Sequence, residues 1–284
     1  MLKTKSPGFK TFACFTLFTL TILAQSCKKS DLKQEETVPQ EELQQLKSFV
    51  ATTTGSTVAS VEYNPAKKYF IAGKDILVGL SDARTRLKNT EISTPSANGS
   101  NQRVYIYTAT QNNVANIAIY ADNTVPSDWI TALDQAIANW NSTNSHVVMK
   151  RVTATTKTTT TGKGKKKTTT TTTVLPSYNI LVNTLYNSST SMVAEAFLPY
   201  SNGTVGNEVH INTYYSYLNS SYKTFALTHE LGHSIGFTHT DGTYGNLVPN
   251  TPETDPNSVM NSFVLPWNGF TPYDIAAVNT IYPR

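Results

Sequence analysis

One continuous run, residues 228–239 (THELGHSIGFTH), constrains this chain more than any other stretch, because it reads H-E-x-x-H-x-x-G-x-x-H without a gap. On a helix of about 3.6 residues per turn, His229 and His233 project from one face and can share a metal ion. Gly236 supplies the backbone freedom that ends the helix and returns the chain. His239 can then reach the same ion as a third ligand.

The composition of the run favours a zinc site over a chance pair of histidines, because three of the chain's five His fall in the pattern. Three neutral imidazoles leave one position of a tetrahedral zinc open, as in catalytic sites. Glu230 lies beside the ion, where its carboxylate can take the proton of a metal-bound water and pass it to a leaving amine. A purely structural site has no need of that carboxylate. The sequence therefore predicts one catalytic Zn²⁺ with Glu230 as the catalytic residue.

Two features follow the run. Met260 stands in the sequence Ser-Val-Met-Asn, 21 positions after His239, which fits a Met turn. A final helix is predicted from Thr271, with Thr as N-cap, Pro272 at the first helical position and Asp274 in the first turn. A helix is also predicted from Ser127.

The two Trp of that helix, Trp129 and Trp140, recur at helical spacing with aliphatic residues, so we expect core packing rather than carbohydrate stacking. Short apolar runs predict strands, among them residues 69–72, 117–120 and 209–212. His210 alternates with its apolar neighbours in the last of these runs. We expect it to be a surface histidine and not a fourth ligand.

The first 26 residues predict a signal peptide, with three Lys before an apolar stretch and a small residue before Cys27. Cleavage there and lipidation of Cys27 would make an exported protein anchored to a bacterial membrane, the outer membrane being expected. If Cys27 is not lipidated, the protein is secreted or periplasmic. The other Cys, Cys14, lies in the removed segment, so no disulfide is expected.

The predicted organisation has three parts after residues 1–26. Residues 27–60 form a polar tether, with a short helix allowed near 39–50. Residues 61–102 form an N-terminal region, and the sequence leaves open whether it is an inhibitory pro-segment. Residues 103–284 form the catalytic domain, with a Thr/Lys-rich insert at 155–173 that suits an exposed hairpin or a disordered loop equally.

The formal net charge of +4 would suggest acidic partners, but many of the basic residues lie in two short segments. Three Lys belong to the predicted signal peptide and five to the Thr/Lys insert, and acidic residues outnumber basic ones in the remainder. Nucleic-acid binding is therefore not indicated.

Taken together, the leader, the residues His229–His239, the Ser258-Val259-Met260 turn and the final helix resemble the bacterial HEIGH metallopeptidases, a metzincin-like family. The resemblance implies an α+β fold: a mixed twisted sheet with an active-site helix, a Met turn and a C-terminal helix. It also implies that Met260 forms a hydrophobic floor under the metal and that an edge strand, 193–199 or 209–212, binds the substrate backbone. Ser262 replaces a Tyr found in astacin-like relatives, and Tyr244 or Tyr273 are the possible substitutes.

The function predicted from the sequence is a zinc endopeptidase that acts on extracellular or periplasmic proteins or peptides, as a monomer. The alternative is a non-catalytic zinc-containing surface lipoprotein that binds a partner or a glycan. The motif also allows hydrolysis of a non-protein amide.

Overall fold

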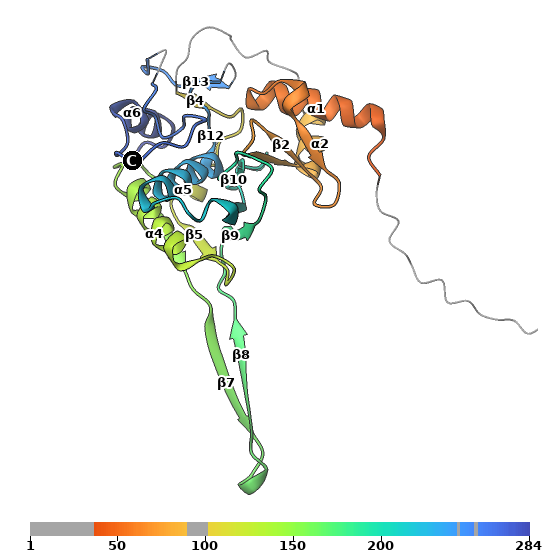
Figure 1. Ribbon diagram of the computed structural model, residues 1–284, viewed down its shortest axis with the longest axis vertical. Helices are drawn as coiled ribbons and strands as arrows, with labels where there is room; N and C mark the ends of the chain where they lie inside the picture. Colours follow the sequence, from red (N-terminus) through yellow and green to blue (C-terminus); the bar gives the residue numbers. More distant parts are fainter. Residues whose placement is uncertain (1–36, 90–101, 243–244, 253–254) are drawn as a thin grey trace, which may run out of the picture. The chain divides into compact units, whose positions relative to one another are not determined.

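The structure, a computed structural model, describes residues 37–89, 102–242, 245–252 and 255–284 (Figure 1). The predicted signal peptide and Cys27 lie outside the described residues. Within these ranges, no helix has both the length and the apolar character that a membrane span needs.

A mixed sheet of eight strands, in the order β1-β2-β3-β10-β11-β9-β5-β6, runs through the described residues. Its strands are β1 (Glu62–Asn64), β2 (Tyr69–Ala72), β3 (Ile76–Gly79), β5 (Ile117–Ala121), β6 (Met149–Val152), β9 (Ile180–Leu185), β10 (Ala194–Phe197) and β11 (Glu208–Asn212). Neighbours from β11 to β6 are parallel, β10 is antiparallel to β11, and β3 is parallel to β10. The predicted α+β class with a mixed sheet is confirmed.

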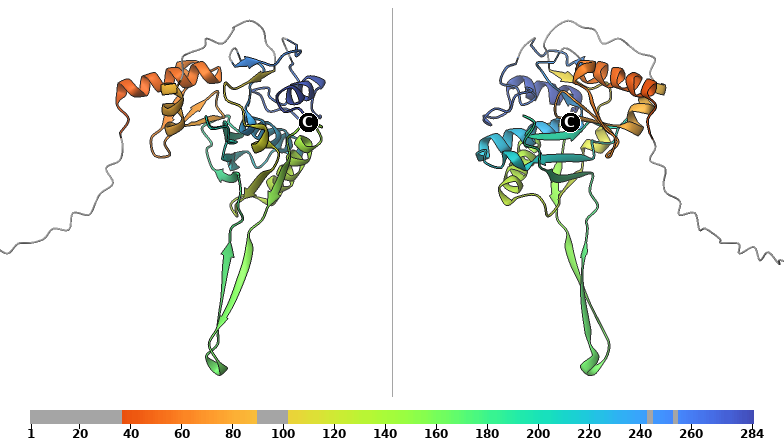
Figure 2. Two further views of the ribbon diagram at one scale, coloured as in Figure 1. Left: turned by 180° about the vertical axis from the view of Figure 1, so that it is seen from behind. Right: turned by 45° about the vertical axis from the view of Figure 1, so that its right-hand side comes forward.

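Two long helices, α4 (Ser127–Asn141) and α5 (Ser220–Ile235), pack against each other and against the sheet (Figures 1 and 2). The main hydrophobic core lies between them and the sheet. Trp129 and Trp140 are buried there, as predicted, and the indole Nε1 of Trp140 donates to the carbonyl of Thr228 in α5 at 2.9 Å. That hydrogen bond fixes α5 against α4.

The C-terminal helix α6 (Pro272–Ile281) begins as the sequence predicts. The Thr271 hydroxyl accepts from the Asp274 backbone N–H, and the Asp274 carboxylate accepts from the Thr271 N–H, which completes a capping box. The remaining helical turns are α3 (Gln111–Val114) and three 3₁₀ turns (Val58–Ser60, Gly164–Lys166 and Thr213–Tyr215). Three short strands, β4 (Arg103–Val104), β12 (Phe237–Thr238) and β13 (Asn246–Leu247), form a second sheet in the order β12-β4-β13.

The N-terminal part differs from the predicted tether and boundary. Helix α1 (Gln40–Thr54) packs on α2 (Leu80–Asn89) and β2, and its Leu46 and Val50 are fully buried in a second hydrophobic core. The residues from Val38 onward belong to one compact unit with the rest of the described chain. Apolar residues at helical spacing in α1 made this packing possible, although polar residues surround them. Strands β1 to β3 extend the main sheet, so no domain boundary falls at residue 103.

The Thr/Lys insert forms an antiparallel hairpin of β7 (Thr155–Thr161) and β8 (Thr168–Val174), one of the two forms considered from sequence. Every residue of both strands is exposed. Facing threonines, such as Thr158 and Thr171, place their hydroxyl oxygens 3.3 Å apart. Figure 1 shows the hairpin pointing away from α5.

Candidate metal centre

Helix α5 carries the first two histidines of the predicted site. It begins at an N-cap, Asn219, whose side chain accepts from the backbone N–H of Ser221 and Tyr222, and it ends at Gly236. Gly236 has φ of +118°, and a Cβ there would lie 3.0 Å from the Thr108 Cα, so glycine is required for both conformation and space. The chain then turns into β12 and returns towards the helix.

This return brings the three imidazoles together. The Nε2 atoms of His233 and His239 are 3.2 Å apart, and those of His239 and His229 are 3.3 Å apart. All three side chains are buried. The three nitrogens therefore converge on one point inside the protein.

The outer ring nitrogens are held by backbone carbonyls. His229 Nδ1 lies 2.7 Å from the Val259 carbonyl oxygen, and His233 Nδ1 lies 2.8 Å from that of Phe237. A carbonyl can only accept, so each Nδ1 carries the proton and each Nε2 presents a lone pair to the centre. This arrangement orients two neutral imidazoles for a metal ion.

The spacing fits one zinc ion. Tetrahedral Zn–N bonds of about 2.05 Å place neighbouring nitrogens about 3.3 Å apart. Lone pairs facing each other at this separation repel unless a cation lies between them. Burial and the neighbouring His229 and His239 rings lower the pKa of His233 well below its ordinary value, which keeps it in the neutral form that binds a metal.

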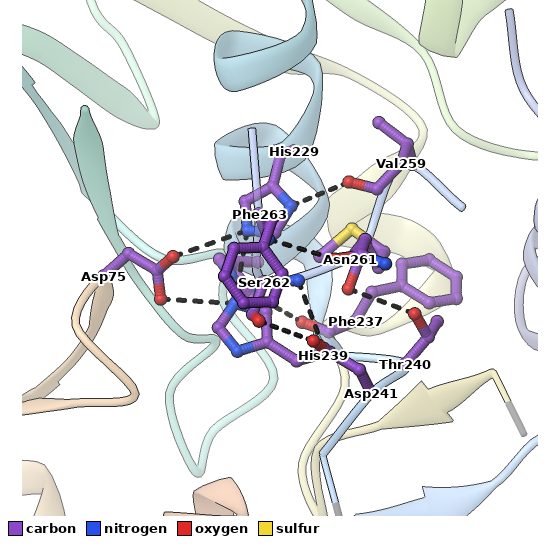
Figure 3. A network of polar contacts seen from close by, with 12 residues as sticks. Asp75, His229, Phe237, His239, Thr240, Asp241, Val259, Asn261, Ser262 and Phe263 are labelled. Atoms are coloured by element: carbon purple, nitrogen blue, oxygen red, sulfur yellow. Dashed lines mark hydrogen bonds and ion pairs between the residues drawn. The ribbon is translucent and has the colours of Figure 1, made fainter. Parts of the chain in front are cut away.

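A fourth group, Asp75, faces the same point and was not identified from the sequence. Its Oδ1 lies 3.2 Å from His239 Nε2 and its Oδ2 lies 3.7 Å from His229 Nε2 (Figure 3). The four ligand atoms, one from each residue, all lie within 4.8 Å of one another. Burial alone would raise the pKa of Asp75, but His239 and the other imidazoles lower it below the usual range. Its carboxylate is therefore ionised beside the imidazoles.

Glu230 is buried next to this cluster, and its Oε2 has no hydrogen-bond partner among the described residues. Burial, followed by the nearby carboxylates of Asp75 and Glu195, raises the pKa of Glu230 well above its ordinary value. A buried carboxylate without a partner costs stability, so its presence favours a chemical role.

Met260 packs against Gly232, the residue of α5 that lies between His229 and His233 in the sequence. A Cβ at Gly232 would come within 2.5 Å of the Met260 Sδ, so the two residues are in close contact. The Thr240 N–H donates to the Met260 carbonyl at 2.9 Å, which ties the Met turn to the residue after His239. That Met260 forms a hydrophobic floor under the metal stays a prediction.

Asp241 connects the same two loops. Its carboxylate accepts from the Ser262 backbone N–H at 3.1 Å and from the Ser262 hydroxyl at 2.6 Å. Neither tyrosine considered from sequence can be assigned to the centre: Tyr273 is exposed on α6, and Tyr244 lies outside the described residues.

The expectation that His210 is a surface residue was wrong. It is buried between two carboxylates, with Nδ1 2.8 Å from Glu195 Oε1 and Nε2 2.9 Å from Glu208 Oε2. Strand alternation predicted that it faces away from its apolar neighbours. Strand alternation could not predict that His210 contacts Glu195 of β10 and Glu208 of β11.

A helix that presents two of three converging buried imidazoles, with a glutamate beside them, defines the class of zinc metallopeptidases, and the protein is one of them. The chain belongs to the HEIGH family: a family model described as "dual-action HEIGH metallo-peptidase" matches residues 71–246, more than half of the chain. This confirms the resemblance noted from sequence.

Similar solved structures include high choriolytic enzyme 1, a hatching enzyme zinc-protease from Oryzias latipes (medaka fish). It shares 13% identity at a TM-score of 0.39, over 62% of this chain and 93% of that chain. Myroilysin shares 12% identity at a TM-score of 0.38, over 61% of this chain and 85% of that chain. No curated protein matches the chain in sequence.

Proposed function

We propose that this zinc metallopeptidase is an endopeptidase that hydrolyses peptide bonds of extracellular or periplasmic proteins. One zinc ion would be held by His229, His233 and His239, and Glu230 would transfer the proton. The observation that carries the proposal is the convergence of three Nε2 atoms, with that of His239 3.2 and 3.3 Å from the other two, beside the buried Glu230 carboxylate, whose Oε2 has no hydrogen-bond partner among the described residues.

When bound, the zinc ion would lower the pKa of a water molecule and polarise the scissile carbonyl. Glu230 supplies the proton acceptor: its carboxylate, buried next to the imidazoles, can take the proton of the attacking water and then release it to the leaving nitrogen. The Nδ1 contacts of His229 and His233 keep both rings in one orientation while this happens.

Peptide bonds are the proposed substrate because a strand lies next to the centre. Strand β10 packs on α5 and lies between β3 and β11, so its backbone could bind an extended peptide by strand addition once β3 is displaced. The family also supports protein or peptide substrates.

The proposal is tested with the soluble chain from Lys28 onward and its Glu230→Gln variant. Both should carry about one zinc per chain, as a single three-His site requires. Casein cleavage should fall by about 10²-fold or more in the variant, because general-base catalysis is lost. Since Asp75 faces the centre and β3 pairs with β10, the same pair is also compared in an Asp75→Ala/Leu77→Pro background, in which both contacts are disrupted. Zinc binding without cleavage in every form would favour the non-catalytic surface lipoprotein.

The cellular location is part of the proposal and is supported by sequence alone. Residues 1–26 would be removed, Cys27 would be lipidated, and the protein would be anchored to the outer membrane. Labelling cells with a radioactive fatty acid should mark the parent protein but not Cys27→Ser. A label that persists in the variant would refute this attachment site. We also propose that the protein is a monomer, which sedimentation of the soluble chain can test.

A further inference from the structure

We propose that residues 62–79, which comprise β1 to β3, are a built-in inhibitor: Asp75 acts as the fourth ligand of the metal, and β3 occupies the peptide-binding edge of β10. The inference rests on the proposed function. It assigns a regulatory role to a segment whose role the sequence left open, and four observations support it.

The first observation is the position of the carboxylate. Three imidazoles leave one ligand position on a tetrahedral zinc, and the Asp75 oxygens lie 3.2 and 3.7 Å from the Nε2 atoms of His239 and His229. Asp75 Oδ1 is buried, and its polar neighbour is the His239 Nε2 at 3.2 Å, one of the nitrogens that face the centre. A carboxylate oxygen in this position can bind a cation at the point where the imidazoles converge.

The second observation is the pairing of β3 with β10. The Ala196 N–H donates to the Asp75 carbonyl at 2.8 Å, and the Leu198 N–H donates to the Leu77 carbonyl at 3.1 Å. On the other side β10 pairs with β11, so without β3 it would be an open edge. The backbone groups with which a peptide substrate would pair are therefore already used.

The third observation explains why the segment would not be cleaved at this point. The Asp75 carbonyl accepts from β10, whereas its side chain faces the imidazoles. Hydrolysis needs the peptide carbonyl, not a side-chain carboxylate, at the metal. The segment thus blocks the centre without presenting the bond after Asp75 to it.

The fourth observation is that the segment divides the cleft. One hollow of about 330 Å³ is lined by Asp75, His229 and Glu230, and another of about 720 Å³ is lined by Gly73 and His239. Lys74 lines both hollows. A peptide crossing the metal would need both sides, so it cannot bind while the turn from Gly73 to Asp75 is in place.

Helix α2, which follows β3 directly, fastens the segment. The Arg86 guanidinium is fully buried, lies 4.7 Å from the ring centres of both Tyr105 and Tyr107, and donates to the Pro199 carbonyl. Asp82 pairs with Arg86. Tyr105, Tyr107 and Pro199 all follow the segment in the chain, so these contacts hold it against the catalytic part.

The test compares the soluble chain from Lys28 with Asp75→Ala, with the similarly sized Asp75→Asn, and with Glu41→Ala, which removes an exposed carboxylate on α1. Each protein is loaded with cobalt(II) in place of zinc and titrated with acetohydroxamic acid, followed by visible absorption. The spectrum of the Asp75 variants should differ from the parent before titration, because a ligand is lost. They should also bind the hydroxamate at least about tenfold more tightly, because an internal ligand competes at high effective concentration. Glu41→Ala should match the parent, and equal affinity in all four proteins would overturn the inference.

Casein cleavage separates this inference from the proposed function. It is measured in the parent and in Asp75→Ala/Leu77→Pro, which also interrupts β3, with thermal melting as the check on folding. Faster cleavage by the double variant supports both proposals. Equal cleavage by both proteins overturns the inference and keeps the peptidase. If the Asp75 variants bind the hydroxamate more tightly than the parent but no form cleaves casein, the inference holds and the proposed peptidase activity is overturned.

Discussion

Gly232 and Met260 are matched to each other: a Cβ on Gly232 would lie 2.5 Å from the Met260 Sδ and 3.1 Å from a ring carbon of Trp140. The glycine in the middle of the zinc motif is therefore a packing requirement. It allows the Met turn to lie directly against the helix that carries two of the candidate ligands.

Gly232→Ala should displace the Met turn and lower the free energy of unfolding by about 1–3 kcal/mol, the usual cost of overpacking a core. Zinc affinity should fall as well, because the Met turn also carries Val259, whose carbonyl orients His229. Thermal melting and competition with a chelator measure the two effects. Gly79→Ala is the matched control, since its Cβ would meet only a Phe197 ring atom at 4.0 Å. Equal effects of the two substitutions would contradict the packing argument.

Asp274→Ala should destabilise the protein by about 2–4 kcal/mol, because it removes a helix cap and several buried hydrogen bonds. The Asp274 carboxylate accepts from the Ser258 hydroxyl, the Val259 N–H and the Gln102 amide. Urea unfolding measures the change. Thr280→Ala, on the exposed side of the same helix, should cost less than about 0.5 kcal/mol. If both variants unfold at the same urea concentration, Asp274 does not hold the Met turn.

The buried His210 should make stability depend on pH. Burial lowers its pKa, but the hydrogen bonds and charges of Glu195 and Glu208 outweigh burial and raise it. The folded state therefore holds the proton more tightly than the unfolded state, whose pKa is about 6.5. This contribution is complete below about pH 6.5 and is lost as pH rises through the folded pKa.

His210→Gln should therefore be less stable than the parent in acid, and the difference should shrink as the pH rises above about 6.5. Urea unfolding of both proteins across this pH range measures the difference in stability. The His210→Gln variant has no ionisable side chain at this position and therefore serves as the reference. A difference that grows with pH would show that the pKa is lowered instead.

Deleting residues 156–173 should leave zinc content and melting temperature unchanged, because the strands of the β7–β8 hairpin are exposed along their whole length. Differential scanning calorimetry and metal analysis test this. The same deletion tests whether the lysines of the tip bind anionic surfaces: sedimentation with vesicles that contain anionic lipid should not change. A loss of vesicle binding would assign that role to the hairpin.

The sequence predicted best what is encoded locally. The end of α5 at Gly236 and the start of α6 at Thr271, with Pro272 and Asp274 in its first turn, depend on residues within a few positions of each other. The burial of Trp129 and Trp140 followed from helical periodicity. In each case the residues that determine the feature lie in one short segment of the sequence.

The features that were missed depend on pairing between distant strands. Asp75 reaches the imidazoles only because β3 pairs with β10, more than 100 residues later in the chain. One local signal existed: Asp75 is the sole acidic residue between Glu62 and Asp82, and it stands between two apolar strands. Without knowledge of the strand pairing, this signal does not show which residues Asp75 contacts. The burial of His210 likewise depends on Glu195 from the neighbouring strand.

The pairing of β3 with β10 also determines which shortened forms of the protein would stay in solution. A chain that begins at residue 103 would expose the backbone of β10, together with Tyr105 and Leu198, which the second core now buries. An unpaired strand edge beside an apolar surface promotes intermolecular pairing and aggregation. Producing the catalytic part by itself would therefore require the N-terminal region to be present while the chain folds.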